Sequence, residues 1–156
     1  MSPRIATPSD AAVVATLLDS FNREFDTPTP GIPVLTERLS THLAGRTMFA
    51  VLIGEPAIGV ALVSLRPTAW YDGPAALLDE LYVDPDHRNR GLGTILLGAV
   101  EDDVRRRGGD VLEINVDGED VDARRFYLRH GYTDTEPGQS EPMLYFFKEF
   151  GAGTPE

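Results

Sequence analysis

The sequence contains no cysteine among its 156 residues. Disulfide bonds, thiolate metal sites and a cysteine nucleophile are therefore excluded. Histidine is scarce as well, since the sequence has only three, His42, His87 and His130, and they are far apart in the chain. This spacing indicates no metal cluster, so we expect no metal cofactor.

Basic residues are also few, with 14 Lys and Arg against 25 Asp and Glu, which gives a formal net charge of −11. This balance disfavours a nucleic-acid surface and mildly favours a cationic partner or substrate. No apolar run approaches the length of a membrane span, and the N-terminus, Met-Ser-Pro-Arg-Ile, lacks the apolar core of a signal peptide. We therefore expect a cytoplasmic protein that binds neither nucleic acid nor a membrane.

The remaining composition is that of an ordinary globular protein, with 42% apolar and 25% charged residues. A chain of this length is most simply one domain with a substantial core. We expect that domain over residues 1–148 and a flexible tail over 149–156.

Hydrophobic periodicity predicts an alternation of helices and strands. Helical spacing of apolar residues occurs at 10–23, 34–44, 92–107 and 121–130, and strand-like runs occur at 4–6, 47–53, 57–65, 76–83, 111–116, 132–133 and 142–148. The helix at 92–107 connects two strands as a βαβ crossover, so strands 76–83 and 111–116 should be parallel.

Two loops leave alternatives open. The segment 26–33, which is rich in proline, is either a connector between two helices or a mobile lid. The adjacent Trp70 and Tyr71 either cap a sheet edge or line a pocket for an acceptor.

The most informative stretch is residues 78–101, where an apolar strand ends at Asp84-Pro85 and a helix begins at Gly91-Leu92-Gly93. The first N–H groups of a helix have no partner inside the helix and carry its positive dipole end, so they can bind an anion. The glycines allow close approach, and Arg88 and Arg90 could add hydrogen bonds suited to a diphosphate. A dinucleotide fingerprint and a Walker loop are both excluded by the spacing. The alternative is a simple strand-to-helix turn with solvated arginines.

Two motifs in the chain resemble the GNAT superfamily of acyl-CoA-dependent N-acetyltransferases. Leu81-Tyr-Val-Asp-Pro followed by Arg88-x-x-Gly91-x-Gly93 is similar to that family's acyl-CoA pyrophosphate loop. Ala123-x-x-Phe126-Tyr127-x-x-x-Gly131-Tyr132 is similar to the helix and turn after its fifth strand. The resemblance covers nearly the whole chain, with the N-terminal third matching in pattern only.

The resemblance implies an α/β (α+β) fold with a mixed, mostly antiparallel sheet of about six or seven strands and helices on both faces. The parallel strands at its centre would splay apart and hold the pantetheine arm of acetyl-CoA. The residues implied for coenzyme binding are Leu81, Tyr82, Val83, Arg88, Asn89, Arg90, Gly91, Leu92, Gly93, Thr94, Asp120 and Phe126. Asp120 departs from the family pattern, because many relatives have an Asn there that donates its amide, whereas an ionised Asp can only accept.

Acyl transfer from a thioester to an amine requires two proton movements. The acceptor ammonium, with a pKa of about 10.4, must lose a proton, and the thiolate leaves better if it is protonated. The resemblance places the phenol of Tyr127 beside the sulfur as the acid. The base is expected to be Glu80, with Asp79 and Glu113 as the other candidates, and a backbone N–H near Val83 would bind the oxyanion.

The resemblance therefore implies a transfer of the acetyl group from acetyl-CoA to a primary amine by direct attack in a ternary complex. The acceptor is either a small molecule or a peptide. The alternatives are a non-catalytic acyl-CoA-binding regulatory domain and an enzyme that uses longer acyl chains. The resemblance also suggests a homodimer formed through the last strands.

Overall fold

The structure is a computed structural model that describes residues 1–151. Contacts divide the chain into two compact units, Met1–Ile114 and Asn115–Glu156, and each unit is described by itself. The single domain expected over 1–148 stays a prediction. Most of the tail expected at 149–156 lies outside the described residues.

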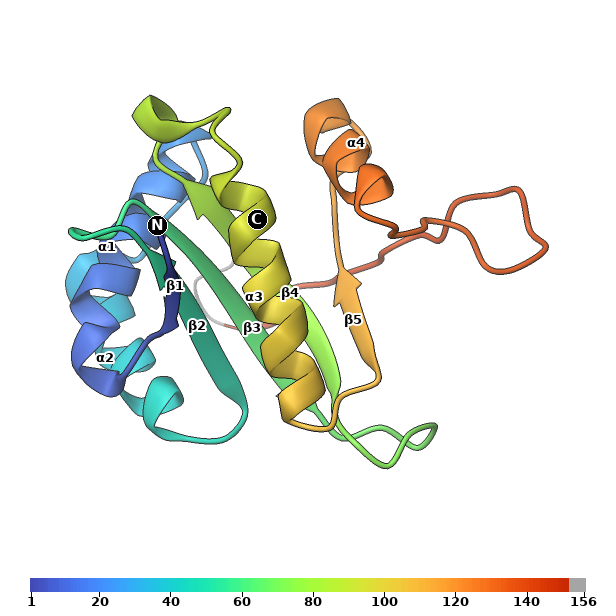
Figure 1. Cartoon of the computed structure of the whole chain (residues 1–156), viewed down its shortest axis with the longest axis horizontal. Helices are drawn as coiled ribbons and strands as arrows, with labels where there is room; N and C mark the ends of the chain where they lie inside the picture. Colours follow the sequence, from blue (N-terminus) through green and yellow to red (C-terminus); the bar gives the residue numbers. More distant parts are fainter. Residues whose placement is uncertain (152–156) are drawn as a thin grey trace. The chain divides into compact units, whose positions relative to one another are not determined.

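The first unit is built on a five-stranded sheet in the order β1-β2-β3-β4-β5 (Figure 1). Its strands are β1 (Pro3–Ile5), β2 (Met48–Ile53), β3 (Gly59–Arg66), β4 (Ala75–Val83) and β5 (Val111–Ile114). Neighbouring strands are antiparallel except β4 and β5, which are parallel. The expected mixed, mostly antiparallel sheet is therefore confirmed, together with the parallel pair inferred from the crossover.

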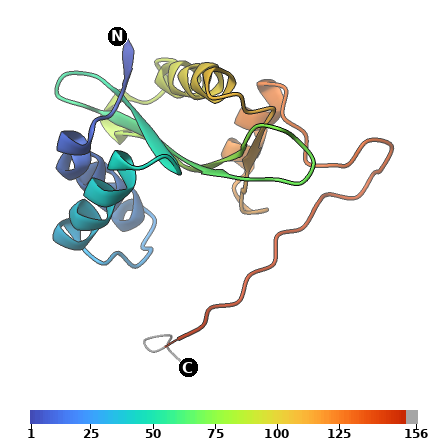
Figure 2. The same cartoon turned by 90° about the horizontal axis from the view of Figure 1, so that it is seen from below.

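Helices cover both faces of this sheet, with α1 (Ala11–Glu24) and α2 (Ile32–Ala44) on one side and α3 (Leu92–Arg106) on the other (Figure 2). Two short 3₁₀ turns, η1 (Pro8–Asp10) and η2 (Pro85–His87), precede α1 and α3. None of the helices within residues 1–151 combines the length and the apolar character that a membrane crossing requires.

The core on the α1–α2 side is a cluster of small and branched apolar side chains. Its buried members are Ala6, Ala11, Val14, Ala15, Leu17, Leu39, Ala50, Leu52, Val60, Leu62 and Tyr82. Because side chains alternate along a strand, the buried neighbours Phe49, Val51 and Ile53 of β2 point to the opposite face. The guanidinium of Arg107, just after α3, lies 4.4 Å from the centroid of the Phe49 ring. Both faces of β2 are thus buried.

The loop between α1 and α2 is held by side-chain hydrogen bonds. The Asn22 amide donates to the Pro28 carbonyl at 2.9 Å, and the Thr29 hydroxyl donates to the buried carboxylate of Asp19 at 2.7 Å. These bonds favour the connector over the mobile lid. Helix α2 begins slightly earlier than predicted because Pro33 lies in its first turn, where a missing N–H costs no helical hydrogen bond.

The second unit contains one helix, α4 (Val121–Arg129), among its described residues. The Asp120 carboxylate caps it by accepting a hydrogen bond from the Ala123 N–H at 3.0 Å. At the other end Gly131 has a φ of 89°, and the Tyr132 N–H donates to the Tyr127 carbonyl at 3.0 Å, as in a Schellman motif. The predicted glycine stop is therefore present.

The strands predicted at 132–133 and 142–148 are not formed. The only β-pairing in this region of the described chain is an isolated bridge between Thr135 and Pro142. The apolar run at 142–148 has strand propensity, but a strand also requires a neighbouring strand to pair with its backbone groups. A local sequence pattern does not show whether such a neighbour is present. The sheet consequently has five strands in place of the six or seven expected.

Candidate functional site

The carboxyl end of β4 has one unpaired edge. Strand β5 pairs with β4 only from Ala75 to Leu78, whereas β3 continues to pair on the other side as far as Val83. The edge from Leu81 to Val83 that faces β5 is therefore left without a β-partner in the first unit. Such an edge can accept an extended ligand as an additional strand.

A β-bulge interrupts β4 just before this edge. Glu80 is opposite Leu62 and Leu78 is opposite Val63, so Asp79 has no partner in β3. Leu62 belongs to the core cluster under α1 and α2, and residues directly opposite on two strands share a face. Glu80 therefore lies on the α1–α2 side, and the bulge breaks the simple alternation that the sequence alone would give.

Glu80 is the more perturbed of the two adjacent carboxyl groups. Burial raises its pKa to about 7, and the nearby charge of Asp79 adds to the rise. A carboxyl group with this pKa is divided between its two protonation states near neutral pH. It can therefore accept and release a proton there, as a general base must.

Asp79 and Glu113 are less suited to this role. Burial raises the pKa of Asp79, and a hydrogen bond with Ser64 opposes that rise. Glu80 is the better candidate for the base, because its half-buried position agrees with its raised pKa, whereas Asp79 is exposed. Glu113 on β5 accepts a hydrogen bond from Arg66 at 2.6 Å and is thereby held as an ion pair.

The segment 88–94, which we call the anion loop, runs from the loop after β4 into the first turn of α3 and presents backbone N–H groups there. Asn89 and Gly91 both have left-handed backbone angles, with φ of 63° and 78°. The first backbone bond of the helix runs from the Ile95 N–H to the Gly91 carbonyl at 3.1 Å, and among the described residues the N–H groups of Leu92 and Gly93 have no acceptor. Apart from the adjacent residues of the chain, no described atom lies within 4 Å of where a Cβ of Gly91 would be, so the approach is open. These features fit a phosphate group.

The side chain of Arg88 is already engaged within the protein. Its terminal nitrogens donate to the two carboxylate oxygens of Glu24 at 2.7 and 2.6 Å, and its Nε donates to the Val83 carbonyl at 2.9 Å. Arg88 therefore fixes the loop through its side chain. Arg90 is exposed and has no ion pair within the described chain, so it is the arginine that remains available to a diphosphate.

Aromatic rings of β4 and α1 lie next to the Arg88 guanidinium. The Arg88 guanidinium lies 5.7 Å from the Tyr82 ring centroid, and the buried Tyr82 ring stacks on Phe21 of α1 with centroids 5.1 Å apart. Sequence reasoning missed Glu24, which is 64 positions from Arg88. No local pattern marks it, because a single acidic residue at the end of a helix is common.

The remaining candidates, Asp120, Phe126 and Tyr127, belong to the second unit. The Tyr127 ring makes edge contacts with Phe126 and Tyr132, with centroids 5.1 and 5.9 Å apart. The Asp120 carboxylate accepts a hydrogen bond from the Ala123 N–H at the start of α4, so it has a structural role as a helix cap.

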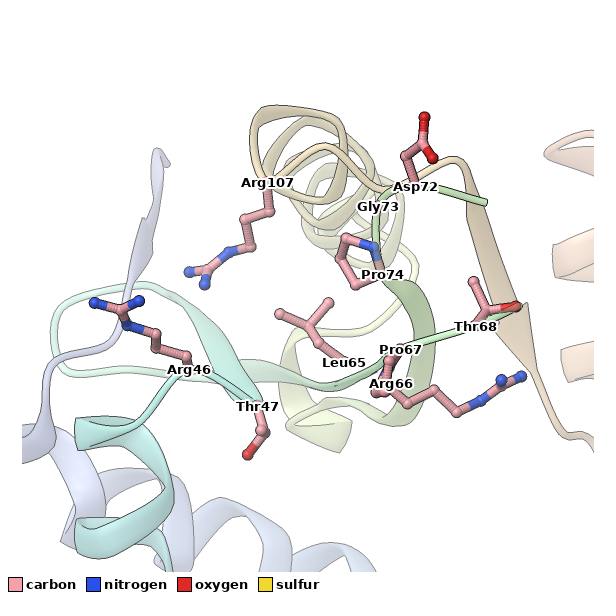
Figure 3. A pocket seen from close by; sticks show the side chains of 10 residues that line it. All are labelled: Arg46, Thr47, Leu65, Arg66, Pro67, Thr68, Asp72, Gly73, Pro74 and Arg107. Atoms are coloured by element: carbon pink, nitrogen blue, oxygen red, sulfur yellow. The ribbon is translucent and has the colours of Figure 1, made fainter. Parts of the chain in front are cut away.

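A cavity of about 550 Å³ lies elsewhere in the first unit (Figure 3). Its lining residues come from the strand ends and loops away from the anion loop: Arg46, Thr47, Leu65, Arg66, Pro67, Thr68, Asp72, Gly73, Pro74 and Arg107. It adjoins the start of β4, whereas the anion loop follows the end of that nine-residue strand, about 27 Å away at 3.4 Å per residue. Trp70 and Tyr71 are exposed and do not line it.

The described residues contain no group of three or more His, Asp or Glu side chains arranged to hold a metal ion. The unpaired edge of β4, the N–H groups at the start of α3 and the carboxyl group of Glu80 have properties that suit an anionic, extended ligand and a proton transfer.

Comparison with known families identifies the family of this chain. Residues 13–132 match the Acetyltransferase (GNAT) family. The chain belongs to the GNAT family. The resemblance noted in the two sequence motifs is thereby confirmed for most of the chain.

Individual relatives agree with this assignment. An aminoglycoside N(6')-acetyltransferase type 1 of Stenotrophomonas maltophilia is 31% identical over 136 residues, which are 85% of this chain and 86% of that protein. A mycothiol acetyltransferase of Beutenbergia cavernae is 36% identical over 85 residues, which are 53% of this chain. The match spans only 27% of that longer protein.

A solved structure extends the likeness to the fold. The crystal structure of a protein from Arthrobacter sp. FB24, provisionally assigned as an acetyltransferase, is 56% identical and superposes with a TM-score of 0.91. The superposition covers 96% of both chains.

Proposed function

We propose that this GNAT protein transfers the acetyl group of acetyl-CoA to a primary amine by direct attack in a ternary complex. The observation that carries the proposal is the position of Glu80, a carboxyl group with a pKa of about 7 near the end of β4, the strand that leads into the anion loop. A base near the end of this strand and a diphosphate site in the loop after it are what a coenzyme-dependent acyl transfer requires.

The coenzyme is held by two backbone features. The pantetheine arm pairs with the unpaired edge of Leu81, Tyr82 and Val83, and its diphosphate accepts hydrogen bonds from N–H groups between Arg88 and Thr94. Arg90 supplies the charge-assisted contact. Leu92 is buried, so its contribution is restricted to its N–H group.

Two proton movements accompany the proposed transfer, and the role of Tyr127 in them rests on the family resemblance. Glu80 accepts a proton from the acceptor ammonium, directly or through a water, and the freed amine attacks the thioester carbon. A backbone N–H near Val83 stabilises the oxyanion, the carbon–sulfur bond breaks, and Tyr127 donates a proton to the departing thiolate. The nitrogen loses its second proton as the acetyl amide forms, and this proton restores the Tyr127 phenol through water. The products are an N-acetyl amine and CoA, and Glu80 releases the proton it accepted to solvent.

A small cationic amine is the acceptor that the chain favours. The net charge of −11 attracts cations, and a relative that the chain matches over most of its length is named for an aminoglycoside. A peptide N-terminus has fewer positive charges and would gain less from this field.

The test is thiol release from acetyl-CoA against a panel of polyamines, aminoglycosides, amino acids and peptide N-termini, with calorimetric titration of acetyl-CoA alongside. We expect binding of acetyl-CoA and release that depends on the amine, fastest with the polycationic amines. Binding without release from any amine would favour a regulatory acyl-CoA-binding domain. Absence of binding would refute the assigned anion loop.

A further inference from the structure

The cavity at the start of β4 is lined by three arginines, although the chain as a whole has a net charge of −11. The arginines come from different elements, since Arg46 precedes β2, Arg66 ends β3 and Arg107 follows α3. Among the ten lining residues, all of them within the described chain, Asp72 alone is acidic. The cavity is therefore a positive region on an acidic protein.

Two of these arginines differ in how far their charge is already neutralised. Arg66 donates a hydrogen bond to Glu113 at 2.6 Å, and its guanidinium points away from those of Arg46 and Arg107 (Figure 3). Arg46 is exposed and forms no hydrogen bond or ion pair with any described residue. The charge of Arg46 is thus available to a ligand, whereas that of Arg66 is paired.

The guanidinium of Arg107 is held in place and keeps donors for a ligand. Its Nε donates to the buried carboxylate of Asp103, and its Cζ lies 4.4 Å from the centroid of the Phe49 ring. Its two terminal nitrogens donate to no described residue. Asp103 also accepts a hydrogen bond from Arg106 at 3.1 Å, so one carboxylate serves two arginines and this group keeps a net positive charge. A fixed guanidinium with two terminal nitrogens available suits a carboxylate or a phosphate.

Arg46 and Arg107 face the same part of the cavity. In Figure 3 both guanidinium groups point to one side of it, whereas the carboxylate of Asp72 points away from them. Like charges that share a space repel each other, and an anion bound between them removes that repulsion.

The walls of the cavity are fixed by close backbone packing. A Cβ added to Gly73 would lie 1.7 Å from the carbonyl oxygen of Gly108, so the loop before β4 packs directly on the turn after α3. On the other side the Leu65 N–H donates to the Thr47 carbonyl at 2.8 Å. Because these contacts hold the lining without a ligand, binding requires little ordering of the chain.

We propose that this cavity binds a small organic dianion, of the dicarboxylate or phosphate-monoester class, between Arg46 and Arg107. Leu65, Pro67 and Pro74 supply apolar walls for a hydrocarbon part of the ligand. The volume of about 550 Å³ lies within the usual range of small-molecule sites, roughly 300–1,000 Å³. The site is at the opposite end of β4 from the anion loop, and it does not depend on the proposed catalytic function.

The first experiment is calorimetric titration of the protein with glutarate and with phenyl phosphate as probes of the two classes. Pentanoate is the control for charge, because it has the same number of carbon atoms as glutarate but one carboxylate. We expect a dissociation constant of roughly 1 mM or lower for at least one dianion, and binding of pentanoate at least tenfold weaker than that of glutarate if the site takes dicarboxylates. The tighter of the two dianions identifies the class. Absence of binding by both dianions would overturn the proposal.

Substitutions then locate the site. Arg46→Gln should weaken binding of the dianion about tenfold, and Arg46→Gln/Arg107→Gln should abolish it. The matched control is Arg105→Gln, since Arg105 lies at the same end of α3 and does not line the cavity; its affinity should equal that of the unaltered protein. Because Arg46 contacts no described partner, its substitution leaves the fold intact and decides the question even if the double variant fails to fold. Equal affinities of Arg46→Gln and Arg105→Gln would refute the site.

A last titration separates this cavity from the anion loop. The dianion is titrated again in the presence of excess acetyl-CoA, and its dissociation constant should be unchanged. Loss of dianion binding under these conditions would place the dianion at the anion loop and overturn the proposal. If acetyl-CoA does not bind at all, the proposed function fails, while the comparison of Arg46→Gln with Arg105→Gln still tests the cavity.

Discussion

The ion pair between Glu24 and Arg88 links the end of helix α1 to the anion loop, so breaking it should disturb the loop. Glu24→Gln keeps the shape of the side chain but replaces one acceptor oxygen by an amide N–H that faces the donors of Arg88. Hydrogen bonds to charged groups contribute about 1.5–3 kcal/mol. Because the two side chains are 37% and 27% exposed, solvent screening reduces our expectation to about 1 kcal/mol.

Two quantities should change in this variant. The melting temperature should fall by roughly 2–4 °C, as expected for a loss of this size in a chain of this length. The dissociation constant of acetyl-CoA, measured by calorimetry, should rise about three- to tenfold, because Arg88 no longer holds the loop in one conformation before binding.

A matched control separates loop positioning from stability. Arg4 forms a similar two-bonded ion pair with Asp10, at 2.8 and 2.9 Å, on parts of the first unit far along the chain from the loop. Arg4→Gln should lower the melting temperature by a similar amount and leave the dissociation constant unchanged. If Glu24→Gln also leaves the dissociation constant unchanged, the pair is structural only and the reasoning is refuted.

Substitutions at Glu80, Tyr127, Asp120 and Gly91 test other parts of the account. Burial raises the pKa of Glu80 from 4.5 to about 7, so the folded state loses stability as the pH rises through this window. Glu80→Gln removes this ionisation. In denaturant titrations it should therefore stabilise the protein by up to about 3 kcal/mol at pH 8 and have no effect at pH 4. Tyr127→Phe should lower kcat at least tenfold with unchanged acetyl-CoA affinity, and an unchanged kcat would remove its assigned role. Asp120→Ala should cost about 1 kcal/mol of stability through loss of the α4 cap, whereas Asp120→Asn should cost little. Gly91→Ala should cost about 1 kcal/mol, because its φ of 78° is unfavourable for alanine, and should weaken acetyl-CoA binding more than the equally solvent-open Gly98→Ala.

Much of the fold could be predicted because the signals are local. Apolar periodicity predicts α3 and α4, and Gly131 predicts the end of α4. The crossover through α3 predicts the parallel pairing of β4 with β5. The anion loop could be proposed for the same reason, since its glycines and arginines are close together in the sequence, and its ligand stays a prediction.

The missed features depend on residues distant in the sequence. The bulge at Asp79 is a property of the register between β3 and β4, and the pairing of Glu24 with Arg88 depends on where α1 ends in space. The segment 142–148 was predicted as a strand from its composition, but a strand also needs a pairing partner, which a local pattern does not show.

The central claim is that Glu80 is the base in an acetyl transfer from acetyl-CoA bound at the anion loop. The most direct test is kcat/KM for the amine against pH, at saturating acetyl-CoA, for the unaltered protein and for Glu80→Gln. The account predicts that kcat/KM of the unaltered protein rises with pH through an apparent pKa close to the value of about 7 at Glu80, and that the variant has a low kcat/KM with no inflection there. A Glu80→Gln variant with the same kcat/KM and the same inflection would contradict the account.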